Sequence, residues 1–180
     1  MVNRVQATNM LHVFGPSWTP TEAYYECRYE ILRKPLGFDR GAEILQDDIA
    51  AIHAYVEVEE TIVAVGRSHL IPKTSDGSQY DFPGQNGPKT PPFSRLNSAN
   101  RPAIQIRQMG TLDNFRRQGF AADILNALEI ASKKQFEATC GFLQAREIAI
   151  PFYKSQGWDI IDEQYSIPNV GPHRSMMKHF

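Results

Sequence analysis

The segment Phe115-Arg116-Arg117-Gln118-Gly119-Phe120-Ala121-Ala122 joins an arginine pair to a glycine and to small residues that open an apolar helix. The first turn of an α-helix has amide groups without intrahelical partners, and the helix dipole adds partial positive charge there. Gly119 lets a ligand approach the backbone closely, and the two arginines can neutralise negative charge. The segment therefore predicts a cradle for a diphosphate group.

The residues on both sides of this segment give it the context that a phosphate site requires. Residues 104–112 predict a strand, and Asp113 and Asn114 predict a turn. After the glycine, apolar residues recur at helical spacing, with polar residues opposite them. The apolar positions are Ala121, Ile124, Leu125, Leu128 and Ala131.

Length and composition exclude several classes of protein. A chain of 180 residues fits one domain with a hydrophobic core, and a net charge of −1 gives no indication of a nucleic-acid or membrane partner. No apolar run suits a signal peptide or a membrane span, so a cytoplasmic location is expected. Cys27 and Cys140 have no motif around them and are expected to fill the core as free thiols.

The first half of the chain predicts two helices and three strands. Residues 10–14 predict a first strand, and a capping box at Thr19 predicts a helix that ends near Lys34. Residues 39–48 predict a short second helix. Residues 52–58 alternate as in a half-buried strand and predict an antiparallel hairpin with residues 61–71.

The second half begins with an unusual insertion. Residues 72–102 hold six of the twelve prolines and predict neither a helix nor a central strand. A loop of this length is either functional, as a substrate lid or an oligomer contact, or disordered.

After the cradle helix, a strand is expected at 138–145 and a short helix at 146–155, with Pro151 either kinking that helix or marking a late start. Gly157 ends it. Closing strands at 158–161 and 175–180 complete a mixed α/β sheet.

Two blocks make the chain similar to the GNAT superfamily of N-acetyltransferases. The first runs from Arg107 to Ala122 and resembles the acetyl-CoA motif Arg/Gln-x-x-Gly-x-Gly/Ala. The second, Ala149 to Trp158, is similar to the family's Ala-x-x-Leu/Phe-Tyr-x-x-x-Gly-Phe block. The resemblance implies a single acyltransferase domain, built on a mostly antiparallel sheet that splays at the cofactor site and is flanked by helices. Arg146 departs from the asparagine common there, and Ala121 replaces a commoner glycine.

The resemblance also implies the reaction: an acetyl group passes from acetyl-CoA directly to a primary amine of a small molecule or peptide. Tyr153 is the expected general acid that protonates the departing thiolate, since an unperturbed phenol is protonated at neutral pH. Backbone groups on the splayed strand would bind pantetheine and polarise the thioester, and the loop would bind the pyrophosphate. The expected cofactor-binding residues are Met109, Gly110, Thr111, Arg116, Arg117, Gln118, Gly119, Phe120, Ala121 and Ala122.

Several points stay open. His69, Glu57 and His173 are each candidates for the general base, and none is favoured. The five histidines have no metal-ligand spacing, so no metal is expected. The basic residues Arg28, Arg33 and Lys34 either attract an acidic acceptor or, as the simpler interpretation, form a solvated helix face. A homodimer is expected from the family alone. The alternatives are a longer-chain acyl-CoA donor and a CoA-binding sensor without turnover.

Overall fold

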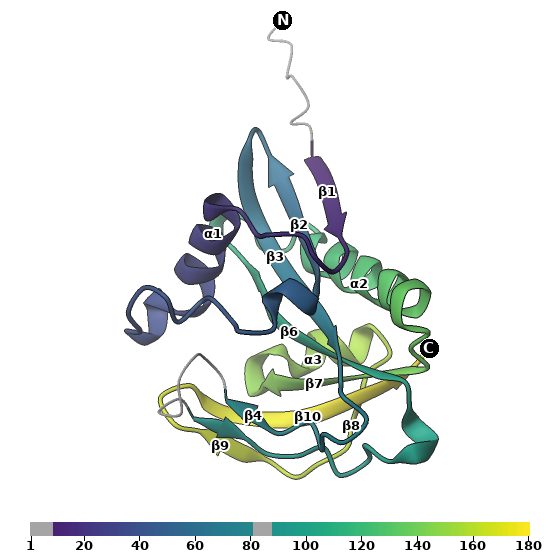
Figure 1. Cartoon of the computed structure of the whole chain (residues 1–180). Coiled ribbons are helices and arrows are strands. Elements are labelled where there is room, and N and C mark those ends of the chain that lie inside the picture. Colours follow the sequence, from purple (N-terminus) through teal and green to yellow (C-terminus); the bar gives the residue numbers. More distant parts are fainter. Residues whose placement is uncertain (1–8, 81–87) are drawn as a thin grey trace, which may run out of the picture.

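The computed structural model describes residues 9–80 and 88–180, which form a twisted sheet with helices on both faces (Figure 1). In the main sheet, the strands follow the order β1-β2-β3-β6-β7-β10-β8, and β9 pairs with β10. The only parallel pair among these strands is β6 with β7. The sheet is therefore mixed and mostly antiparallel, as the sequence and the resemblance predict.

The first three strands form a continuous antiparallel unit. They are β1 (Asn9–Phe14), β2 (Ile52–Val58) and β3 (Thr61–Leu70). The predicted hairpin between β2 and β3 is confirmed. The prediction that β2 is half-buried is wrong, because five of its seven residues are buried. The reason is that helices cover both faces of this part of the sheet, so the polar positions of the alternation are enclosed as well.

Helices α1 (Glu22–Leu32) and α2 (Phe120–Phe136) lie on opposite faces of β3. A Cβ added to Gly66 on β3 would meet Ile124 and Leu128 of α2. One added to Gly110 on β6 would instead meet Ile31 and Leu32 of α1. Each glycine thus permits a close helix-to-sheet contact.

The start of α1 and the segment after it differ from the prediction. The N-cap is Thr21, whose Oγ1 accepts a hydrogen bond from the Tyr24 amide at 3.3 Å, so Thr19 and Pro20 precede the helix. The helix predicted over residues 39–48 does not form. Gly41, at a φ of +100°, breaks the helical path, and the buried Asp48 carboxylate holds the chain by accepting from the Leu45 amide at 2.9 Å.

Strand β6 (Ala103–Thr111) is followed by a 3₁₀ turn at Asp113–Phe115, by α2, and by β7 (Cys140–Arg146). β6 and β7 pair only over Ala103–Gln105 and Cys140–Phe142. Beyond these residues the strands diverge, as Figure 1 shows. The predicted splay is confirmed.

The described part of the 72–102 insertion contributes no strand to the main sheet. It contains a two-stranded ribbon, β4 (Gln79–Tyr80) with β5 (Lys89–Thr90), and a 3₁₀ turn at Ser98–Asn100. The buried Phe93 packs against Phe142 of β7, with ring centroids 5.1 Å apart. The insertion therefore lies on the β7 part of the sheet. Its residues 81–87 lie outside the described residues.

The C-terminal part contains one short helix and three strands. Pro151 marks a late start: a 3₁₀ turn covers Glu147–Ala149, and α3 (Ile150–Ser155) has the proline in its first turn. Short strands β8 (Asp159–Ile160) and β9 (Tyr165–Ile167) both pair with β10 (Gly171–His179). β10 begins four residues before its predicted start at 175, and β9 was not predicted.

Candidate acyl-transfer site

A β-bulge shapes the middle of β6. Arg67 of β3 lies opposite Arg107, but Val65 lies opposite Gly110, so β6 has one extra residue between these pairs. Gln108 adopts a left-handed φ of +54° there. A bulge interrupts the hydrogen-bond ladder and redirects backbone groups. The predicted residues Met109, Gly110 and Thr111 follow it and line a cleft beside β6.

The N-terminus of α2 forms the second part of this cleft. Arg117 and Gly119 have positive φ values of +61° and +90°, and no side chain in the described part of the protein caps the helix. Among the described residues, no group accepts from the amides of Gly119, Phe120 and Ala121. Backbone of this kind, with adjacent amides and left-handed residues, forms a concave anion site. A Cβ at Gly119 would have no atom within 4 Å, so this site opens outward.

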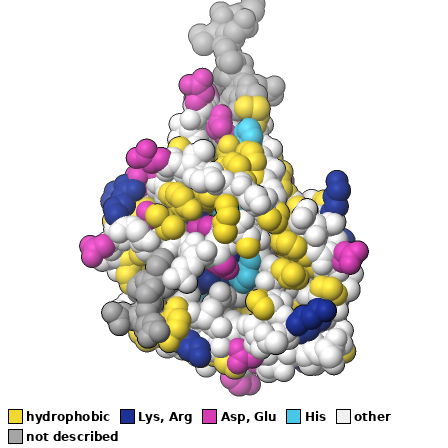
Figure 2. All heavy atoms as spheres, viewed as in Figure 1, with side chains coloured by type: hydrophobic (Ala, Val, Ile, Leu, Met, Phe, Trp, Pro, Cys, Tyr) yellow, Lys and Arg dark blue, Asp and Glu magenta, His cyan; other side chains and the backbone are white. Residues whose placement is uncertain are grey.

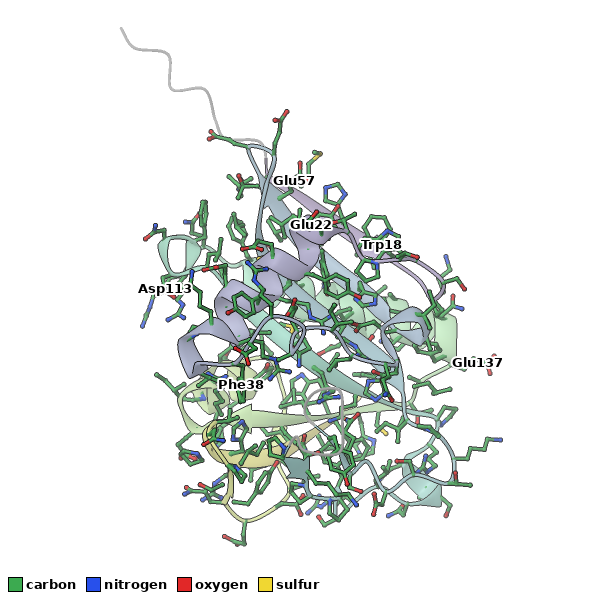
Figure 3. The ribbon with its side chains drawn as sticks, turned by 60° about the vertical axis from the view of Figure 1, so that its left-hand side comes forward. Trp18, Glu22, Phe38, Glu57, Asp113 and Glu137 are labelled. Atoms are coloured by element: carbon green, nitrogen blue, oxygen red, sulfur yellow. The ribbon has the colours of Figure 1, made fainter. Side chains whose placement is uncertain are left out.

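The predicted loop residues differ in where they lie. Arg116, Arg117, Gly119, Phe120, Ala121 and Ala122 line the cleft, whereas Gln118 is exposed and does not. Arg116 is paired with Asp113 at 2.7 Å, with both side chains more than half exposed. This ion pair is weak because solvent screens it, so Arg116 can exchange Asp113 for an anionic ligand. In Figure 3, Asp113, in the 3₁₀ turn that precedes α2, and Glu137, at the C-terminal end of α2, lie on opposite sides of the view.

The cleft has a volume of about 840 Å³ and extends between the diverging strands. Its β7 wall includes Leu143, Gln144 and Ala145, and α3 contributes Tyr153. A cleft of this size suits a small organic ligand or cofactor. The bulge, the helix N-terminus and Tyr153 thus face one continuous space.

Tyr153 is a buried phenol that makes no hydrogen bond with any described residue. Its ring packs edge-on against Trp158 (6.4 Å between centroids) and Phe152 (5.0 Å). Burial raises the pKa of its hydroxyl above the ordinary value of a tyrosine. The group is therefore protonated at neutral pH and is available as a proton donor to the cleft.

Comparison with known proteins identifies the family of the chain. The model of the acetyltransferase (GNAT) family matches residues 17–158, which include α1, the bulge, the α2 N-terminus and α3. The chain belongs to the GNAT acetyltransferase family. No curated protein gives a significant match to this chain.

Solved structures of GNAT proteins share the fold at low identity. Escherichia coli ElaA has a TM-score of 0.66 at 15% identity, with 95% of this chain and 99% of ElaA covered. FeeM, an N-acyl amino acid synthase from uncultured soil microbes, has a TM-score of 0.65 at 10% identity (98% and 92% covered). Arabidopsis thaliana Naa50, solved with the bisubstrate analogue CoA-Ac-MVNAL, has a TM-score of 0.59 at 16% identity (94% and 99% covered).

The three candidate bases of this GNAT chain lie in different places. Glu57 lies at the far hairpin, 3.7 Å from His12, and does not line the cleft. His69 lines a second cavity, where burial and then the Arg67 charge lower its pKa to about 3. Only His173 of the three lines the cleft; its Nδ1 donates to the Gly171 carbonyl at 2.8 Å.

The predicted solvated face of α1 is wrong for two of its three basic residues. Arg28 is fully buried, with Nη1 3.1 Å from Oδ1 of Asp48, and Arg33 is only 3% exposed. Lys34 is exposed as predicted and pairs with Glu30 at 2.8 Å. Burial of Arg28 follows from a carboxylate twenty residues away, which no helix-face pattern reveals.

Arg28 belongs to an ion cluster between α1 and β3, in which Arg28, Asp48 and Arg67 are buried and Asp47 is partly exposed. Arg67 donates to both oxygens of Asp47, at 2.9 and 2.7 Å, and to Asp48 at 3.0 Å. Hydrogen bonds from Arg67 hold the pKa of Asp47 far below its usual range, although burial opposes this. Figure 2 shows acidic, basic and histidine side chains grouped below the middle of the viewed face.

Three further features concern the described residues as a whole. Cys27 and Cys140 are buried free thiols, as predicted. No group of three or more His, Cys, Asp or Glu side chains in the described ranges could hold a metal ion. Among the helices that the structure describes, none is both long and apolar enough to cross a bilayer.

Proposed function

We propose that this GNAT acyltransferase moves an acetyl group from acetyl-CoA to a primary amine by direct attack within a ternary complex. The observation that carries the proposal is the row of amides at Gly119, Phe120 and Ala121, which bond to no group of residues 9–80 and 88–180 and face a cleft that continues to Tyr153. A pyrophosphate fits such amides because they supply several donors and a positive dipole. The bisubstrate analogue in Naa50, which joins CoA to an acetylated peptide, is consistent with this arrangement.

The donor would lie along the unpaired edge of β6. Met109 and Gly110 follow the bulge and line the cleft, and the backbone amide of one of them would polarise the thioester carbonyl. The neutral amine attacks that carbonyl carbon, the carbon–sulfur bond breaks, and the nitrogen gives up one proton to solvent, from which Tyr153 is reprotonated. Tyr153 donates its proton to the departing sulfur. The raised pKa of Tyr153 supports this role, because the hydroxyl stays protonated throughout the physiological range.

Thermal unfolding with and without acetyl-CoA tests the donor site. At about one hundred times its dissociation constant, a ligand adds about 2.7 kcal/mol to the free energy of unfolding. For a domain of this size that is a rise in Tm of about 5 to 10 °C. No rise at millimolar acetyl-CoA would overturn the proposal.

Two variants of Gly119 separate charge from backbone strain. Gly119→Ala and Gly119→Glu both place a side chain at a φ of +90°, so they share the same strain, and neither meets an atom within 4 Å at its Cβ. Only Gly119→Glu puts a negative charge beside the amides. We expect the acetyl-CoA shift to survive largely in Gly119→Ala and to disappear in Gly119→Glu.

A further inference from the structure

A continuous series of hydrogen bonds crosses the gap between the diverging strands β6 and β7. Nη1 of Arg107 on β6 donates to Oε1 of Gln79 at 2.9 Å, and Nε2 of Gln79 donates in turn to Oε1 of Gln105. Nε2 of Gln105 donates to Oε1 of Gln144 on β7 at 3.4 Å. The series ends where Nε2 of Gln144 donates to the Pro91 carbonyl at 3.1 Å. Each of the three glutamine side chains therefore both accepts and donates within it.

These side chains lie between two cavities. Arg107 and Gln144 line the cleft of the proposed donor site. Arg107, Gln79 and Gln105 line the second cavity, which has a volume of about 1170 Å³. Among the described residues, Arg107 alone lines both. The four side chains of Arg107, Gln79, Gln105 and Gln144 thus form a polar partition between the cleft and the second cavity.

An apolar group cannot enter the polar partition without loss of hydrogen bonds. Gln105 is its central link: the side chain is buried, and both its oxygen and its nitrogen are bonded to other members. A hydrocarbon chain offers neither a donor nor an acceptor in exchange, so it would leave a buried amide unpaired. The polar partition therefore opposes such a chain, although the second cavity behind it has room and apolar side chains such as Leu45 and Ile71.

The proposed donor directs its acyl group toward the polar partition. β6 runs from Ala103 to Thr111, and the α2 amides that would bind the pyrophosphate follow its last residue in the chain. A donor that extends from those amides past Met109 runs back along β6, toward Arg107 and then Gln105. Two residues of a strand span about 6.5 Å, so a few carbon atoms added to the acetyl group bring the acyl chain to Arg107.

We propose that the polar partition makes the protein selective for the acetyl group over longer acyl groups on CoA. The inference rests on the proposed function, because it takes the direction of the donor from the α2 amides. Hydrogen-bonded side chains, rather than an apolar wall, then set the limit on acyl length. An acyl group of six carbons has to separate members of the polar partition to reach the second cavity, and this weakens its binding.

The test measures the binding of donors and needs no acceptor. CoA, acetyl-CoA and hexanoyl-CoA are titrated separately into the full chain by isothermal calorimetry, with thermal unfolding as a second measure. We expect the Kd of hexanoyl-CoA to exceed that of acetyl-CoA at least about 10-fold, the scale of one buried polar group left unpaired. CoA is the reference, because it offers the same pyrophosphate without an acyl group.

Two variants open the polar partition from different sides. Gln105→Ala removes the central link, and Gln79→Ala removes the link from the insertion, which lies outside the main sheet and does not line the cleft. Each should tighten the binding of hexanoyl-CoA and lower the ratio of the two Kd values at least about 5-fold, with the Kd of acetyl-CoA unchanged. Ser132→Ala is the matched control. It also removes a buried hydrogen bond, between the hydroxyls of Ser132 and Ser68 at 2.8 Å, but Ser132 lines neither cavity, so the ratio should stay that of the unmodified chain.

The outcomes separate the inference from the proposed function. Equally tight binding of hexanoyl-CoA and acetyl-CoA by the unmodified chain overturns the inference. An unchanged ratio in Gln79→Ala also overturns it, even where Gln105→Ala does not fold, and so does an equal fall of the ratio in Ser132→Ala. These three results leave the proposed function intact, because acetyl-CoA still binds. Failure of CoA and of both thioesters to bind overturns the proposed function itself.

Discussion

Replacing Tyr153 with phenylalanine should separate catalysis from stability. The change removes one hydroxyl that has no partner among the described residues, and the ring keeps its contacts with Phe152 and Trp158. The free energy of unfolding should therefore change by less than about 1 kcal/mol. Loss of a general acid, in contrast, lowers kcat by about 10² to 10⁴-fold.

The assay follows thiol release from acetyl-CoA at saturating donor and acceptor, beside urea unfolding of the same preparations. Tyr29→Phe is the matched control: it removes a hydroxyl that donates to the Phe38 carbonyl at 3.2 Å, outside the cleft, and should keep the full rate. Because burial raises the pKa of Tyr153, its deprotonation should cause no loss of rate below about pH 10. An unchanged kcat in Tyr153→Phe would refute the role of this hydroxyl.

Three further predictions concern stability. Asp48→Ala should lower the free energy of unfolding by about 3 to 5 kcal/mol in urea titrations, because it leaves buried guanidinium charge uncompensated. The pKa of His69 is about 3 in the folded chain, below its value in the unfolded chain. Between these two pKa values the imidazole binds a proton only in the unfolded chain, so acid favours unfolding. His69 should lower stability by up to about 1.4 kcal/mol per pH unit from pH 6 toward 3, beside a contribution from His53, whose pKa burial lowers to about 4. His69→Gln should remove the His69 part of the slope, and an unaltered slope would contradict the assignment. Gly66→Ala should destabilise by about 1 to 3 kcal/mol, since its Cβ collides with Met109, whereas Gly15→Ala, with open space around it, should be neutral.

Much of the fold could be predicted because local patterns agree with the tertiary structure. The β2–β3 hairpin and the α2 helix follow from alternation and from helical periodicity. The helix predicted over residues 39–48 does not form, because the buried Asp48 carboxylate accepts a hydrogen bond from the Leu45 amide and holds the chain in a turn. Local helix propensity does not reveal such a contact. Short strands such as β9 depend on pairing with β10, and three residues give too little pattern to detect.

The sequence predicted the site residues that belong to the two motifs. Apart from Gln118, the loop from Arg116 to Ala122 lines one cleft with Tyr153, because both belong to continuous segments with a recognisable order of residue types. Gln79 and Gln144 escaped prediction. Their roles depend on how the insertion folds across the sheet, and no spacing in the sequence encodes that contact.

That contact has a mechanical meaning. The two halves of the sheet share only three residue pairs between β6 and β7, so backbone hydrogen bonds alone join them weakly. The insertion ties the halves together: Gln79 contacts Gln105 and Arg107 on one side, and the Pro91 carbonyl accepts from Gln144 on the other at 3.1 Å. The insertion thus braces the two halves of the sheet and fixes the width of the cleft between them. A substitution at Gln79 or Pro91, neither of which lines the cleft, can therefore change the width of the cleft.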